Sequence, residues 1–140
     1  MVVVVGVDES DHGVDVVERA VEEARLRDAE LHVVHVFHPP VLPYMGAPID
    51  MAAVAAAQRQ AVWERVEPLI AKAAVSVERV DLEGYPPDML VEYADGVGAN
   101  LLIVGSRGRG EFAALILGST SHRAIHLAHC DVLVVKPSHA

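Results

Sequence analysis

The chain has 140 residues, a formal net charge of −9 at pH 7, 52% hydrophobic residues and 4% aromatic residues. This length and composition predict one folded domain over residues 1–140 with an aliphatic core, and they argue against disorder. The net negative charge disfavours binding to nucleic acid or to an anionic membrane. Cys130 is the only cysteine, which excludes an internal disulfide. With no basic leader and no apolar stretch as long as a membrane span, we expect a cytoplasmic protein.

The chain begins with a strand followed by a helix. The apolar, β-branched run at residues 2–7 is typical of a strand buried on both faces. Apolar residues then recur at helical spacing, and Ser10 or Asp11 is the candidate cap of this helix. Residues 31–37 predict the second strand, which ends at a proline-rich stretch that continues neither regular structure.

The middle of the chain predicts a second helix, a third strand and a third helix. The second helix starts at Asp50 and is long, with a kink or break expected at Pro68, because proline lacks the N–H that a helix interior requires. The third strand is predicted at residues 75–82. The third helix is predicted at residues 86–97, with proline in its first turn and Gly98 as its stop.

The last part predicts a strand at residues 101–104, a helix at residues 119–128 and a final strand at residues 132–135. Strands that alternate with helices argue for a parallel sheet, because each crossover returns over the sheet in a right-handed sense. We therefore predict an α/β fold in which helices flank both faces of a five-stranded parallel sheet.

Two glycine-containing segments follow the fourth strand. Gly105, Gly108 and Gly110 allow main-chain N–H groups to approach an anion closely. The segment Gly118-Ser119-Thr120 opens a helix whose first N–H groups have no partner within the helix, and its hydroxyls add donors. These segments predict a phosphate site beyond the carboxyl ends of the strands.

Two familiar phosphate-binding motifs do not match. Glu111 and Phe112 stand where a P-loop requires lysine and serine or threonine. The order Gly-x-x-Gly-x-Gly reverses that of the dinucleotide fingerprint, and it follows the fourth strand instead of the first. The segment therefore needs another explanation.

The spacing of Gly105, Gly108 and Gly118-Ser119, directly after Leu-Leu-Ile-Val, resembles the nucleotide-binding signature of the universal stress protein family. The sequence Val-Gly-Val-Asp-Glu-Ser at residues 5–10 resembles the opening of that family, and residues 129–136 resemble its ending. Asp131 departs from the family pattern, which more often has proline there.

The resemblance implies a Rossmann-like sheet with an ATP site between the first and fourth strands. Asp8 would accept a hydrogen bond from a ribose hydroxyl or a metal-bound water, and the main chain of Val36 would face the adenine edge. Magnesium or manganese would be held through the phosphates. The implied cofactor-binding residues are Gly6, Asp8, Val36, Gly105, Ser106, Arg107, Gly108, Arg109, Gly110, Gly118, Ser119 and Thr120.

Several residues have alternative interpretations. Asp8 could cap the first helix instead of binding ligand, and the two roles are compatible. Arg107 and Arg109 could be solvated instead of paired with phosphate. A metal site is disfavoured at two groups of histidines, at positions 122, 126 and 129 and at positions 32, 35 and 38.

The functional prediction is an ATP-binding stress-response protein with at most slow hydrolysis, because no paired acid and base or activated nucleophile is recognisable. The resemblance also suggests a homodimer that pairs through Val132–Val135, an apolar edge strand. One alternative is a nucleotide-independent dimeric interaction module. The other is binding of a different adenine nucleotide such as cyclic AMP.

Overall fold

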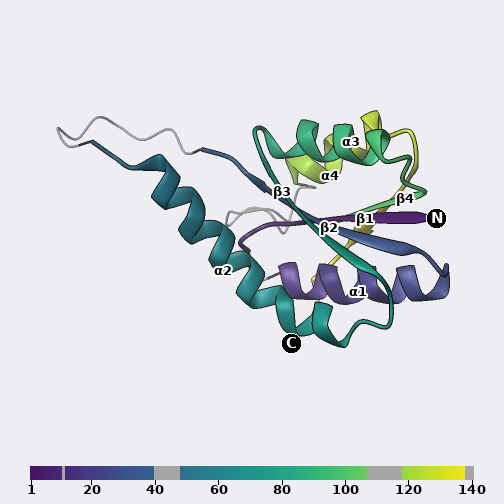
Figure 1. Ribbon diagram of the computed structural model, residues 1–140. Helices are drawn as coiled ribbons and strands as arrows, with labels where there is room; N and C mark the ends of the chain where they lie inside the picture. Colours follow the sequence, from purple (N-terminus) through teal and green to yellow (C-terminus); the bar gives the residue numbers. More distant parts are fainter. Residues whose placement is uncertain (11, 40–47, 107–117, 138–140) are drawn as a thin grey trace.

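The computed structural model describes residues 1–10, 12–39, 48–106 and 118–137. Strands and helices alternate along these residues (Figure 1). In chain order they are β1 (Val2–Val7), α1 (Gly13–Leu26), β2 (Glu30–Phe37), α2 (Met51–Lys72), β3 (Val77–Glu83), α3 (Pro86–Gly96), β4 (Leu101–Gly105), α4 (Ser119–Leu127) and β5 (Asp131–Val135).

The strands form one sheet of five parallel strands in the order β3-β2-β1-β4-β5. The chain runs outward from β1 to β3 and then restarts on the other side of β1 with β4. The strand order therefore reverses between β1 and β4, which is where open parallel sheets bind ligands. The predicted parallel α/β fold is confirmed, and it is Rossmann-like.

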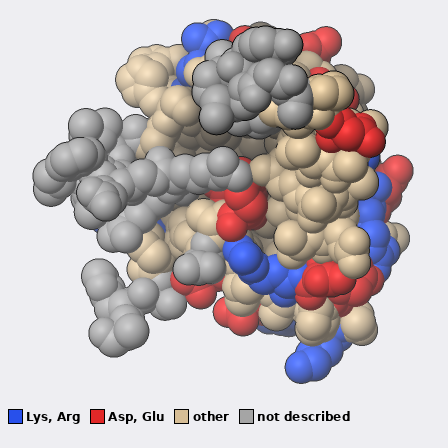
Figure 2. All heavy atoms as spheres, turned by 90° about the vertical axis from the view of Figure 1, so that its left-hand side faces the viewer, with Lys and Arg blue, Asp and Glu red and all other residues tan. Residues whose placement is uncertain are grey.

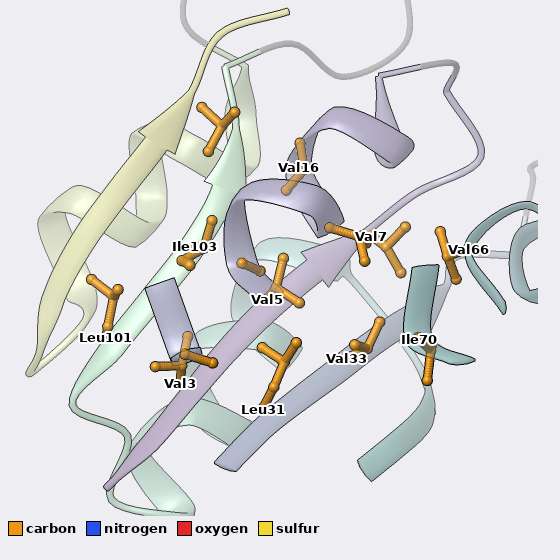
Figure 3. Close-up of a cluster of buried hydrophobic side chains, with 14 of the residues drawn as sticks. Val3, Val5, Val7, Val16, Leu31, Val33, Val66, Ile70, Leu101 and Ile103 are labelled. Carbon is orange, nitrogen blue, oxygen red and sulfur yellow. The ribbon is translucent and has the colours of Figure 1, made fainter. Parts of the chain in front are cut away.

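Helices cover both faces of the sheet, with α1 and α2 on one side and α3 and α4 on the other (Figure 1). Val3, Val5 and Val7 of β1 point into the core beneath α1 and α2 (Figure 3). Val4, between them in the strand, belongs to the core beneath α3 and α4. Alternate side chains of one strand fill both cores, which explains the continuous apolar run in the sequence.

The start of α1 differs from the prediction. The helix begins at Gly13, and its N-cap residue is His12, which makes no side-chain capping hydrogen bond. Ser10 is therefore not the cap, and Asp11 lies outside the described residues. The physical reason is a local turn, because the carboxylate of Asp8 accepts hydrogen bonds from both the main-chain N–H and the hydroxyl of Ser10.

Helix α2 starts as predicted, with the Asp50 carboxylate accepting a hydrogen bond from the N–H of Ala53 at 3.1 Å. Of the kink or break predicted at Pro68, the break does not occur, because the helix continues to Lys72. Val66 and Ile70, on either side of Pro68, are buried in the core, whereas Pro68 itself is exposed. Burial of this apolar face stabilises the last turns of the helix despite the missing N–H of proline.

Strand β3 is displaced toward the carboxyl terminus relative to the prediction, and spans Val77–Glu83 instead of residues 75–82. It lies at one edge of the sheet, paired only with β2 among the described strands. No helix in the described part of the chain combines the length and apolarity that crossing a membrane requires.

Candidate functional site

The candidate site lies at the carboxyl ends of β1 and β4. These strands pair in parallel, with Val5 opposite Ile103, so Gly6 and Asp8 emerge from the sheet beside Gly105 and Ser106. Figure 2 views the molecule from this end, where acidic and basic side chains of the described residues lie next to each other. The net charge of the chain is −9, so a bound polyanion would depend on local donors and not on long-range attraction.

Gly6 allows close packing between β1 and α3. A Cβ atom at this position would lie 2.5 Å from Cδ2 of Leu90, a buried residue of α3. The sequence predicted that Gly6 lies beside a ligand. The structure shows that the space where its side chain would project is filled by the protein itself.

Gly105 has a similar relationship with the start of α1. A Cβ atom there would lie 2.8 Å from Cδ2 of His12. His12 is buried, and its Nε2 lies 2.8 Å from the carbonyl oxygen of Val135, to which it donates. Sequence analysis missed His12, since only the folded chain brings residue 12 next to residues 105 and 135.

Asp8 is oriented by its own loop. Its Oδ1 accepts from the N–H of Ser10 at 2.9 Å and from the hydroxyl of the same residue. These bonds lie within the loop and do not cap the first turn of α1, so the interpretation of Asp8 as the cap of that helix is wrong. On the other side of the loop, Nη1 of Arg65 in α2 donates to the carbonyl oxygens of Glu9 and Ser10, each at 2.8 Å.

The start of α4 is tied directly to the end of β4. The N–H of Gly118 donates to the carbonyl of Ser106 at 3.1 Å, and the N–H of Ser106 donates to the carbonyl of Val135 at 2.8 Å. The hydroxyl of Ser121 donates to the carbonyl of Gly105. The structure thus brings together the ends of the predicted loop, whereas Arg107, Gly108, Arg109 and Gly110 lie outside the described residues.

Within the described residues, the first turn of α4 has no side-chain cap. Its N-cap residue, Gly118, has no side chain to accept from the amides of Thr120 and Ser121, and no acidic residue occupies the first turn. Ser119 is exposed and Thr120 is half-buried. Such a helix start attracts an anion through its N–H groups and its dipole.

Val36 lies at the end of β2, one residue beyond the pairing between His35 and Val7 of β1. The N–H of Gly84 donates to the carbonyl of Phe37 at 2.9 Å, so the main chain of Phe37 faces β3. Because main-chain groups alternate along a strand, those of Val36 face the opposite direction, toward the end of β1. This places the main chain of Val36 beside the candidate site.

A buried histidine next to this position has no hydrogen-bond partner among the described residues. Both ring nitrogens of His35 lack one, although its Nδ1 lies 3.5 Å from Oδ1 of Asp81. Burial lowers the pKa of His35, and the nearby Asp81 carboxylate acts in the opposite direction. The indole N–H of Trp63 donates to the same carboxylate oxygen at 2.9 Å.

The three histidines of the α4 region have separate environments. His122 and His126 contact each other edge to face, with ring centroids 4.7 Å apart. His129 lies 2.8 Å from the Asp95 carboxylate of α3, and this bond lowers the pKa of Asp95. His129 therefore links the segment after α4 to α3 and does not join the other two rings.

The sheet order and the glycine-containing ends of β1 and β4 define a Rossmann-like α/β protein with its candidate site at the β1/β4 switch point. The model of the universal stress protein family matches residues 1–136, and the chain belongs to that family. A universal stress protein of Thermus aquaticus is 36% identical over 132 residues, covering 92% of this chain and 93% of that protein.

Two solved structures carry adenine nucleotides. A universal stress protein in complex with cAMP has a TM-score of 0.70 and 33% identity, over 99% of this chain and 98% of that chain. The universal stress protein from Archaeoglobus fulgidus in complex with dAMP has a TM-score of 0.70 and 29% identity, over 97% of this chain and 98% of that chain. Both similarities extend over essentially the whole chain.

Proposed function

We propose that this universal stress protein binds ATP in the cytoplasm and acts in a stress response through its nucleotide-dependent shape or partners. Binding of adenine nucleotides is supported by the similar structures that contain cAMP and dAMP. The preference for ATP rests on the loop that joins β4 to α4, whose glycine spacing resembles that of ATP-binding family members.

The hydrogen bond from Gly118 to Ser106 carries the proposal. It holds the start of α4 beside the end of β4, so a phosphate bound by the N–H groups of Ser119 and Thr120 would lie next to the β1/β4 switch point. The chain has a net charge of −9, and long-range attraction of a nucleotide is therefore weak. Local main-chain donors must supply the affinity.

The adenosine end would lie between β1 and β2. Asp8, already oriented by Ser10, would accept a hydrogen bond from a ribose hydroxyl, and the main chain of Val36 would bind the adenine edge. Magnesium or manganese would be held through the phosphates, where it would neutralise charge. The carboxylate of Asp8 offers that ion an outer contact through water.

Titration with ATP and magnesium, followed by calorimetry and by melting temperature, tests the proposal. We expect saturable binding that G118A weakens at least tenfold, because an added methyl group crowds the donors at the start of α4. The backbone of Gly118, with φ −59° and ψ 158°, accepts alanine without strain. G96A is the matched control, because nothing lies within 4 Å of a Cβ at that position.

The same calorimetric titration also distinguishes the candidate nucleotides. Comparison of ATP with cAMP and AMP shows whether the terminal phosphates contribute to affinity. Equal affinities would overturn the preference for ATP, and no binding of any of them at millimolar concentration would overturn the whole site. We expect any hydrolysis of bound ATP to be slow, because no paired acid and base or activated nucleophile is recognisable.

The alternative function, a dimeric interaction module that needs no nucleotide, is supported by the sheet edge at β5. This strand pairs only with β4 among the described strands. Val132, Leu133 and Val134 are half-exposed there, and Ile125 and Leu127 of the adjoining helix are exposed. An apolar edge strand favours pairing with a second copy. If G118A abolishes nucleotide binding but retains cellular function, this alternative is preferred.

A further inference from the structure

A cluster of potential metal ligands lies at the amino ends of β2 and β3, away from the candidate nucleotide site at the carboxyl ends. It contains Glu30 and His32 of β2 and Glu78 of β3. Parallel pairing places Glu78 directly opposite His32, and residues 30 and 32 project from the same face of their strand. The register of two strands therefore builds the cluster.

The donor atoms converge. Nε2 of His32 lies 3.1 Å from Oε1 of Glu30 and 3.5 Å from Oε2 of Glu78, and one ligand atom from each residue lies within 4.8 Å of the others. Donors bound at about 2.1 Å around a tetrahedral ion are separated by about 3.4 Å. The three atoms thus need only small movements to bind one ion.

The other ring nitrogen of His32 is already fixed. Its Nδ1 lies 2.8 Å from the hydroxyl oxygen of Tyr93, on α3. Without an ion, Nε2 donates its hydrogen to Glu30 and Nδ1 accepts from the hydroxyl; metal binding requires the other tautomer, in which Nδ1 donates to the hydroxyl and the lone pair of Nε2 faces the two carboxylates. Metal-binding histidines are commonly oriented in this way by a hydrogen bond from the second nitrogen.

Burial is uneven across the cluster. The side chain of His32 is 8% exposed, whereas those of Glu30 and Glu78 are 44% and 58% exposed. A rigid imidazole at the base and two solvent-facing carboxylates leave a route by which an ion can enter and keep water ligands. A single Nε2–H can donate well to one carboxylate, but a divalent ion binds both at once.

We propose that Glu30, His32 and Glu78 form a binding site for a divalent first-row transition ion such as Zn²⁺, with water completing its coordination. Imidazole selects such ions over Mg²⁺ and Ca²⁺, which prefer oxygen ligands alone. The bound ion would join β2 to the edge strand β3 at the end of the sheet opposite the nucleotide site.

Calorimetric titration of the untagged, full-length protein with ZnCl₂, after treatment with a chelator, tests the site. We expect one bound ion, with affinity reduced at least tenfold in E78Q and abolished in H32Q. The affinity of Y93F for Zn²⁺ should be about 10- to 100-fold lower than that of the wild type, because the substitution removes the oxygen that orients the imidazole. Circular dichroism in chelator identifies any variant that fails to fold, and E78Q is the decisive variant because its side chain is exposed.

The control is H126Q, since His122 and His126 bring two imidazole rings close together, with centroids 4.7 Å apart. Retention of Zn²⁺ binding by H126Q together with its loss in E78Q would support the proposal. Loss of Zn²⁺ binding in H126Q, with full retention of binding in E78Q, would place the ion on α4 and overturn the proposal. Absence of binding to the wild type at 1:1 stoichiometry would also overturn it, whatever the result with ATP.

Discussion

The ring of His12 lies where a side chain on Gly105 would project: a Cβ there would be 2.8 Å from Cδ2 and 3.2 Å from Nε2 of the imidazole. The ring cannot easily retreat, because it is buried and its Nε2 donates to the carbonyl of Val135. Glycine at the end of β4 is thus required by packing at α1, independently of any ligand.

We expect G105A to lower the free energy of unfolding by about 1–3 kcal/mol, as overpacking of a buried contact does. Removal of the opposing ring should relieve the clash, so the double variant G105A/H12A should lose less than the sum of the single losses. Urea denaturation of the four proteins measures this coupling. Additive losses would show that His12 is not the residue with which the methyl group collides.

A second prediction concerns Asp8. D8N should weaken ATP binding at least tenfold, because an amide is a poorer acceptor for a ribose hydroxyl or a metal-bound water than a carboxylate. S10A removes only the hydroxyl that contacts Asp8, and the main-chain N–H of residue 10 still orients the carboxylate. S10A should therefore bind ATP almost as the wild type does. If calorimetry shows that D8N and S10A weaken ATP binding equally, Asp8 acts only by shaping the loop.

A third prediction follows from burial of His35, which lowers its pKa in the folded state. The unfolded chain, with an ordinary histidine pKa of about 6.5, then binds more protons than the folded chain at acidic pH. The stability that depends on a neutral His35 in the folded state is fully present above the unfolded pKa of about 6.5. It is lost as the pH falls through the folded pKa, with a slope of at most about 1.4 kcal/mol per pH unit. Asp81 and Asp8 oppose the shift, and Arg59 reinforces it.

Urea denaturation between pH 4.5 and 8 measures this effect. H35Q, which cannot titrate, should give a shallower dependence of the unfolding free energy on pH than the wild type. H38Q is the matched control, because His38 is exposed and lies just beyond the same strand. An unchanged slope in H35Q would contradict the assignment of the acid sensitivity to His35.

A fourth prediction concerns the free edge of β5. The carbonyl of Val135 faces β4, where it accepts from Ser106, so the main-chain groups of Val134 face away from the sheet. V134P removes an N–H from that free edge but none of the bonds to β4. If two copies pair through residues 132–135, light scattering should show a dimer for the wild type and a monomer for V134P. A monomeric wild type would contradict the proposed pairing.

The order and type of the elements could be predicted from the sequence because each has a strong local pattern. The valine run of β1 and the helical spacing in α1 need no knowledge of distant residues. Errors arose where a local alternative or tertiary packing prevailed. Ser10 is engaged by Asp8 and cannot cap α1, and α2 continues through Pro68 because its buried face is held by the core.

The site could be predicted only as far as its residues are close in sequence or share a known pattern. Gly105, Ser106 and Gly118 were named from spacing, and the structure brings them together. His12 was missed because its partner Val135 lies at the far end of the chain. The cluster at His32 was missed for the same reason, since it depends on the register that places Glu78 opposite it.

The carbonyl of Val135 receives two donors, the N–H of Ser106 and Nε2 of His12. A single carbonyl oxygen on the edge strand β5 thus binds both Ser106, which follows β4, and His12, the N-cap residue of α1. Any change that displaces β5 must disturb these bonds. If a ligand binds more tightly while they are intact, reciprocity requires that displacement of β5 and ligand affinity change one another by the same factor.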